Sequence, residues 1–171
     1  MQRELFSQLR AIRDANKYRL TYILFLRNLP EKLRSPKDNE SFYELISRNM
    51  LGLGPYSAMD SFHIIGQLEK RRDHELNKEN REWVWNNSGG HPGLIQALFA
   101  FVKENSLTTA QKQNPEWLVK QEIIREEFRK IWNGLLDEEQ DALKKIAQGD
   151  QKSVSFSTGT LLLGKGIIKT S

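Results

Sequence analysis

The 171-residue sequence contains no cysteine and no long apolar run. The lack of cysteine excludes disulfides, thiolate metal sites and cysteine nucleophiles within these residues. It is also typical of a cytoplasmic protein, which is the location we expect. The longest apolar stretch, around 22–26, is far too short to cross a bilayer, and the N-terminus is charged and amphipathic, unlike a signal peptide. We therefore expect no membrane partner.

Motifs for nucleotide hydrolysis and metal binding are also missing. No G-x-x-x-x-G-K-[ST] phosphate loop occurs, and no predicted strand ends in paired acidic residues that could hold magnesium. His63 has no histidine or carboxylate three or four residues further along the same face, so no metal site is predicted. The acidic residues within 137–141 are interpreted as a dipole-favoured first helical turn, not as an acid–base pair. We expect these residues alone not to hydrolyse a nucleotide.

The composition that remains is that of a soluble globular protein. Apolar residues make up 38% of the chain and charged residues 28%, with a net charge of +4. Because the positive charges are scattered, we interpret them as part of a mixed, solvated surface and not as a binding site for a polyanion.

Apolar residues recur at helical spacing through most of the chain, so the predicted fold is mainly α. Two strands are also predicted, a buried one over 18–26 and a short one over 166–169. The polar stretch 105–114 is the best candidate for a domain boundary. The helices are predicted over 2–16, 41–47, 58–70, 78–87, 92–105, 116–132, 137–148 and 157–163.

Several helix ends are marked by residues with a clear local role. Ser57 is predicted to cap a helix, with Asp60 at its third position. Gly89 and Gly90 are predicted to end the helix before them in the left-handed conformation. Pro92 is predicted to open the next helix, where its missing N–H costs nothing.

Three stretches, taken in order, carry a family resemblance. They are YRLTYILFLRNLP at 18–30, LGLGPYSAMDSFHIIGQL at 51–68 and SGGHPGLIQALFAFV at 88–102. Together they resemble the second half of the nucleotide-binding module of STAND-class ATPases, which are AAA-related signalling ATPases akin to NB-ARC proteins. In that family a core strand ends in the sensor 1 arginine, and a helical lid with a G-x-P motif and a winged-helix domain follow. The resemblance spans nearly the whole chain.

The resemblance implies a domain organisation. Residues 1–55 would be the C-terminal part of an α/β P-loop NTPase core, which includes sensor 1. Residues 56–107 would form the helical lid, and residues 114–171 a partial winged-helix domain. The implied fold class is therefore mainly α, with a small α/β remnant of the NTPase core.

The same resemblance implies four nucleotide-binding residues, Arg27, Gly90, His91 and Pro92. An arginine after a strand can bind terminal phosphate oxygens in a bidentate way, although it can equally face solvent. The Gly90–Pro92 motif would lie near the base and couple the lid to the nucleotide state. A tight turn between two helices explains the same residues without a ligand. The implied cofactor is ATP or ADP, with magnesium held by a region upstream of Met1.

The function implied is the sensor, lid and winged-helix portion of an ATP-dependent signalling switch. Its partners would be the nucleotide and effector or sensor domains of the same polypeptide. A homo-oligomer is compatible with it, because the edge of strand 18–26 needs a partner. The alternative is a non-catalytic helical interaction module or a winged-helix DNA-binding module. DNA is not expected, because the candidate reading helix within 156–166 carries only Lys165.

Overall fold

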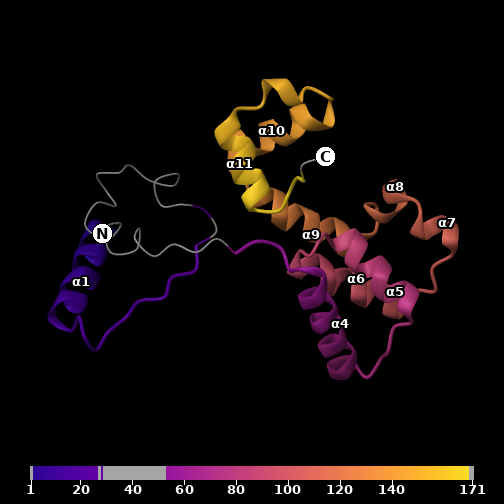
Figure 1. Cartoon of the computed structure of the whole chain (residues 1–171), viewed down its shortest axis with the longest axis horizontal. Coiled ribbons are helices and arrows are strands. Elements are labelled where there is room, and N and C mark those ends of the chain that lie inside the picture. The colour runs from indigo at the N-terminus through magenta and orange to yellow at the C-terminus, as the bar shows by residue number, and fades with distance from the viewer. Residues whose placement is uncertain (1, 27, 29–52, 170–171) are drawn as a thin grey trace. The chain divides into compact units, whose positions relative to one another are not determined.

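The computed structural model describes residues 2–26, 28 and 53–169 (Figure 1). The predicted sensor Arg27 and the predicted helix over 41–47 lie outside these residues. The chain divides into two compact units, Met1–Leu51 and Gly52–Ser171. The described residues are mainly helical, as predicted, and they contain no strand.

The first unit contains helix α1 (Gln2–Ala15), close to the predicted 2–16. The strand predicted over 18–26 is wrong for the described residues, because the chain forms turns up to Arg19 and has no regular structure over 20–26. An extended segment becomes a strand only when its backbone pairs with a neighbour, and Phe25 is 83% exposed instead of buried in a sheet. The Tyr22 hydroxyl donates to the carbonyl of Leu9 in α1 at 2.9 Å.

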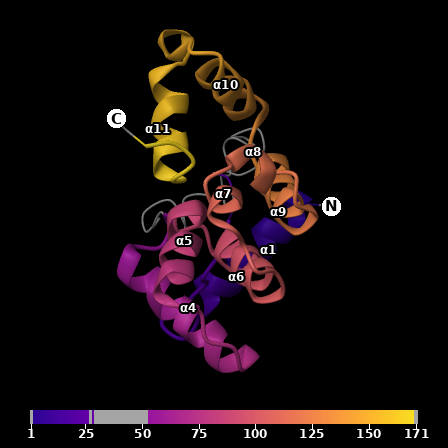
Figure 2. The same cartoon turned by 90° about the vertical axis from the view of Figure 1, so that its right-hand side faces the viewer.

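The core of the second unit is built around one buried helix. Helix α6 (Pro92–Glu104) lies against α4 (Ala58–Arg72) and α5 (Lys78–Ser88), as Figures 1 and 2 show. Its sequence is apolar on most sides, as expected for a helix surrounded by others. The buried apolar side chains of this core include Ile65, Val84, Ile95, Leu98 and Phe101.

The helix predicted over 116–132 is interrupted. It is replaced by α8 (Pro115–Leu118) and α9 (Glu122–Asn133), with a break at 119–121. Leu118 and Ile124 are both buried in the apolar core that surrounds α6. On one continuous helix, residues six apart would point about 120° apart, so the two would not lie on one face. The break brings them to the same side.

The core continues across the predicted boundary at 105–114. The short helix α7 (Thr109–Lys112) lies there, and the indole N–H of Trp83 in α5 donates to the Lys112 carbonyl at 3.0 Å. Helix α9 then packs against α6. These contacts cross the stretch 105–114, and the domain boundary predicted there stays a prediction.

The C-terminal part of the second unit has a small core of its own. Helices α10 (Asp137–Ala147) and α11 (Phe156–Gly164) pack together with the 3-10 turn η2 (Gln151–Ser153). Leu135, Ala142 and Leu162 are the buried apolar residues between them. The strand predicted over 166–169 is wrong, because this segment forms turns and bends against the helix pair. Ile167 and Ile168 pack on the small core, and that packing replaces a sheet.

Candidate functional site

The turn between α5 and α6 contains three of the four predicted site residues, and two glycines set its path. Gly89 has φ 57° and Gly90 has φ 80°, both in the left-handed region that glycine adopts without strain. The Ser88 hydroxyl accepts from the Gly90 N–H at 3.2 Å, and the Ser88 carbonyl accepts from the His91 N–H at 3.0 Å. The predicted left-handed helix end at Gly89 is confirmed.

His91 caps the start of α6. Its Nδ1 accepts from the Leu94 N–H at 3.4 Å, and Pro92 occupies the first helical position, as predicted. Burial lowers the pKa of His91, and the nearby Glu127 carboxylate partly offsets this by raising it. A neutral ring suits the cap, because a protonated Nδ1 cannot accept a hydrogen bond.

The segment before α4 closes over this turn. The Tyr56 N–H donates to the Gly90 carbonyl at 2.9 Å. A Cβ on Gly90 would overlap the Tyr56 carbonyl and crowd Pro55, so only glycine permits this approach. On its other side, Pro55 lies where a Cβ on Gly166 would be. Residues 55–56 thus contact both the turn and the segment after α11.

A carboxylate from α9 faces the N-terminus of α6. The side chain of Glu127 fills the space in which a Cβ on Gly93 would lie. Its other oxygen is 3.0 Å from the Lys130 Nζ, and the side chain is only 15% exposed. The Gly93 N–H, at the second position of α6, has no intrahelical acceptor. The sequence analysis missed Glu127, because one glutamate among the charged residues of an amphipathic helix carries no signal of its own.

The structure thus brings Gly90, His91 and Pro92 together with Tyr56 and Glu127. Pro92 is exposed at the helix entrance, whereas His91 is half-buried. Arg27 lies outside the described residues, so its predicted role in binding the nucleotide stays a prediction.

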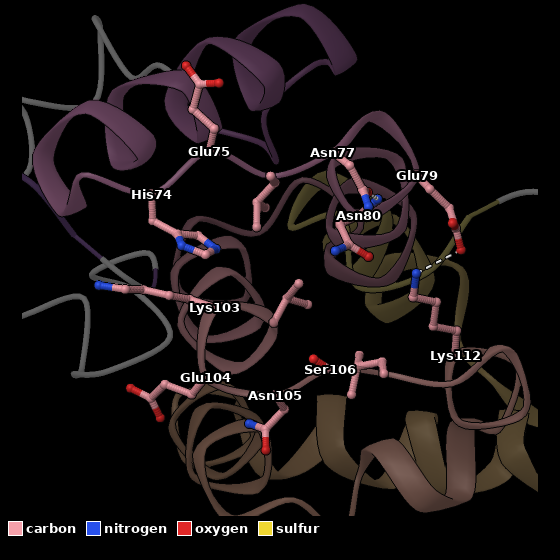
Figure 3. A pocket seen from close by; sticks show the side chains of 13 residues that line it. His74, Glu75, Asn77, Glu79, Asn80, Lys103, Glu104, Asn105, Ser106 and Lys112 are labelled. Atoms are coloured by element: carbon pink, nitrogen blue, oxygen red, sulfur yellow. Dashed lines mark hydrogen bonds and ion pairs between the residues drawn. The ribbon is translucent and has the colours of Figure 1, made fainter.

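A polar hollow of about 550 Å³ lies elsewhere in the second unit (Figure 3). It is formed where α5 begins and α6 ends, so it is about 18 Å along α6 from the turn. Some of its polar groups are engaged: Lys112 pairs with Glu79 at 2.7 Å, and the Asn77 side chain accepts from the Asn80 N–H at 2.8 Å. The Asn105 amide donates to the Phe101 carbonyl at 2.9 Å. The Asn80 Oδ1, which also lines the hollow, is buried and has no hydrogen-bond partner among the described residues.

None of the helices in the described ranges combines the length and apolar character that a membrane span requires. The same ranges hold no group of three or more histidines and carboxylates placed to bind a metal ion.

Comparison of the chain with models of known protein families, with curated proteins and with solved structures finds no match.

Proposed function

We propose that the chain is the sensor, lid and winged-helix portion of an ATP-dependent signalling switch, and that the turn at Gly90–Pro92 is its nucleotide-sensing element. In such a switch the nucleotide stabilises one arrangement of lid and core over another. Arg27 acts as the γ-phosphate sensor in this proposal, on the strength of the family resemblance alone.

The observation that carries the proposal is the meeting of two motifs. The segment Leu53–Ser57 and the turn Gly90–Pro92 belong to different stretches on which the resemblance rests. The hydrogen bond from the Tyr56 N–H to the Gly90 carbonyl joins them. Two motifs of one ligand site have to lie together, whereas two unrelated turns do not.

The turn also suits the chemistry of a nucleotide. A helix N-terminus attracts anions through its free N–H groups and its dipole, and here Gly93 supplies the first such donor. His91 contributes a half-buried ring and Pro92 an exposed apolar ring at the same entrance. ATP and ADP carry different negative charges on their phosphates, so the turn would meet a different charge in each nucleotide state. These residues hold no phosphate loop, so the proposal gives them the sensing of the nucleotide and not its hydrolysis.

A helical interaction module is the second candidate. Helix α9 leaves Ile123, Phe128 and Trp132 between 36% and 39% exposed, and such apolar side chains can contact a protein partner. The DNA-binding alternative has less in its favour. Lys165, the one cation of its candidate reading helix, lies 2.7 Å from the buried Glu139 carboxylate. That ion pair ties it to α10.

Hydrogen–deuterium exchange of the 171-residue chain tests the proposal. The chain is compared alone, with ADP, with ATP and with duplex DNA. We expect slower exchange at 88–95 with either nucleotide and no change over 137–147. If exchange at these amides requires the binding site to open, a ligand at about five times its Kd slows that exchange about sixfold. Unchanged exchange at 88–95 with both nucleotides contradicts the proposal, and protection by DNA alone favours the DNA-binding alternative.

A further inference from the structure

We propose that Glu127 is an internal competitor for the phosphate position at the N-terminus of α6. This inference rests on the proposed nucleotide-sensing function and adds a means of regulating it. In the arrangement described here, Glu127 closes the entrance, and a nucleotide opens it by displacing the carboxylate. Because Glu127 belongs to α9, the displacement changes the contact between that helix and the start of α6.

The position of Glu127 is the first support. Its carboxylate lies directly against Gly93, in space that a side chain at that position would fill. A phosphate oxygen bound to the Gly93 N–H would lie about 2.9 Å from that nitrogen. A Cβ on Gly93 and this nitrogen would be bonded to the same Cα, so the phosphate and the Glu127 carboxylate would be close neighbours whose charges repel each other. Binding a phosphate there therefore favours movement of Glu127 away from the entrance.

The local charges are the second support. A negative charge is favoured at a helix N-terminus, so Glu127 satisfies the dipole of α6 when no ligand is bound. Lys130, one turn along α9, holds the other oxygen of Glu127 at 3.0 Å. The Lys130 side chain is 68% exposed, so it can turn toward an incoming phosphate when Glu127 leaves. Lys130 would then pair with Glu127 when the site is empty and with the phosphate when the nucleotide is bound.

The packing of the helices is the third support. Helices α6 and α9 share the core around Ile124 and Leu98, so α9 cannot leave without exposing apolar surface. A side-chain rotation of Glu127 is the smaller change. Glu127 can thus act as a latch that opens by a change of its side chain while α9 stays packed on α6.

The test compares three proteins by binding of ADP and of inorganic pyrophosphate, followed through the backbone amide signals of Gly93 and Leu94. They are the wild-type chain, Glu127→Gln and Glu126→Gln. The control, Glu126→Gln, removes the same charge from the neighbouring, exposed residue of α9. We expect Glu127→Gln to bind both probes roughly three to ten times more tightly than wild type. Glu126→Gln should bind like wild type.

The outcomes separate the two proposals. If wild type binds ADP at these amides and Glu127→Gln binds it equally well, the latch is wrong and the nucleotide-sensing function stands. If none of the proteins binds either probe there, the proposed function fails and the latch fails with it. Glu127→Asp, which keeps the charge but is one methylene shorter, serves as a second variant if Glu127→Gln does not fold. It should also bind more tightly than wild type, and equal binding overturns the latch.

Discussion

His91 shows how one side chain links the turn to pH. Its ring accepts the capping hydrogen bond through Nδ1, which is possible only while that nitrogen is unprotonated. Burial favours the same neutral form and lowers the pKa of His91, with Glu127 acting in the opposite direction. The folded chain therefore binds a proton at His91 less readily than the unfolded chain does.

The sign of the resulting pH dependence follows from linkage. A folded pKa below the ordinary value of 6.5 gives stability that is present above this pH and is lost as the pH falls toward the folded pKa. We expect wild type to lose up to about 1 kcal/mol through this cap on acidification from about pH 7 to pH 5. Urea unfolding at several pH values measures it. His91→Asn keeps a capping oxygen without a titrating ring and should flatten the dependence, whereas the exposed control His63→Asn should not.

The two glycines of the turn give a second prediction. Both have positive φ, but a Cβ on Gly89 would meet open space, whereas one on Gly90 would overlap the Tyr56 backbone. We expect Gly89→Ala to cost about 1 kcal/mol of unfolding free energy. Gly90→Ala should cost about 2–4 kcal/mol, because strain and overlap add. Equal costs, measured by chemical denaturation, would show that Tyr56 does not close over the turn.

At the scale of single residues, features that depend only on neighbouring residues could be predicted from the sequence. The Ser57 cap, which accepts from the Asp60 N–H at 3.1 Å, and the left-handed Gly89 were both predicted and are confirmed. Glu127 was not predicted, because it meets Gly93 only through the packing of two helices distant in sequence. A single sequence gives no information about which charged residue of α9 faces α6.

Helices α4 and α5 are joined by a buried ion pair. Glu69 is 5% exposed and receives two hydrogen bonds from Arg81, at 2.7 and 2.8 Å, as well as one from the Leu76 N–H at 2.8 Å. The carboxylate therefore fixes both the end of α4 and the loop that leads to α5. Its sequence separation from Arg81 is twelve residues, which no local pattern would identify.

Removal of this cation should destabilise the second unit. Arg81→Met leaves the Glu69 carboxylate buried without its main partner, and because Arg81 itself is 42% exposed we expect a loss of about 1–3 kcal/mol. The matched control is Arg125→Met, which removes an arginine from an exposed pair with Glu122 and should cost about 0.5 kcal/mol or less. Urea denaturation of both variants gives the comparison. Similar losses would mean that the buried pair contributes no more than a surface one.

Among the elements, helices were predicted well and strands were not. Apolar spacing and caps are local, so α4, α5 and α6 begin where the sequence placed them. The strand over 18–26 was predicted from apolar content alone, but a strand depends on pairing with other segments. The break at 119–121 was missed because it follows from burying Leu118 and Ile124 together, which is a tertiary requirement.

On the scale of the whole molecule, the second unit holds its own cores and all four tryptophans. We therefore expect a chain of residues 52–171 to unfold with the same tryptophan fluorescence midpoint in urea as the full chain, within about 0.3 M. The physical reason is that the apolar core lies within this unit. A much lower midpoint would show that residues 1–51 are needed for its stability.

The mainly α fold class could be predicted from the sequence, because apolar residues recur at helical spacing over many residues. The division of the chain after Leu51 was not predicted as such, although the proposed end of the NTPase core at residue 55 lies close to it. The α/β remnant and the winged helix stay proposals, since their evidence is the resemblance and not the described elements.

The most direct test of the central claim, that the turn senses a nucleotide, is a titration of the wild-type chain with ADP that follows backbone amide signals. We expect saturable shifts at Gly90, His91 and Leu94, together with Tyr56 because it is bonded to the turn. Signals around the polar hollow, such as that of Asn80, should stay unchanged. Shifts confined to the hollow, or no saturable shift at the turn, would contradict the account.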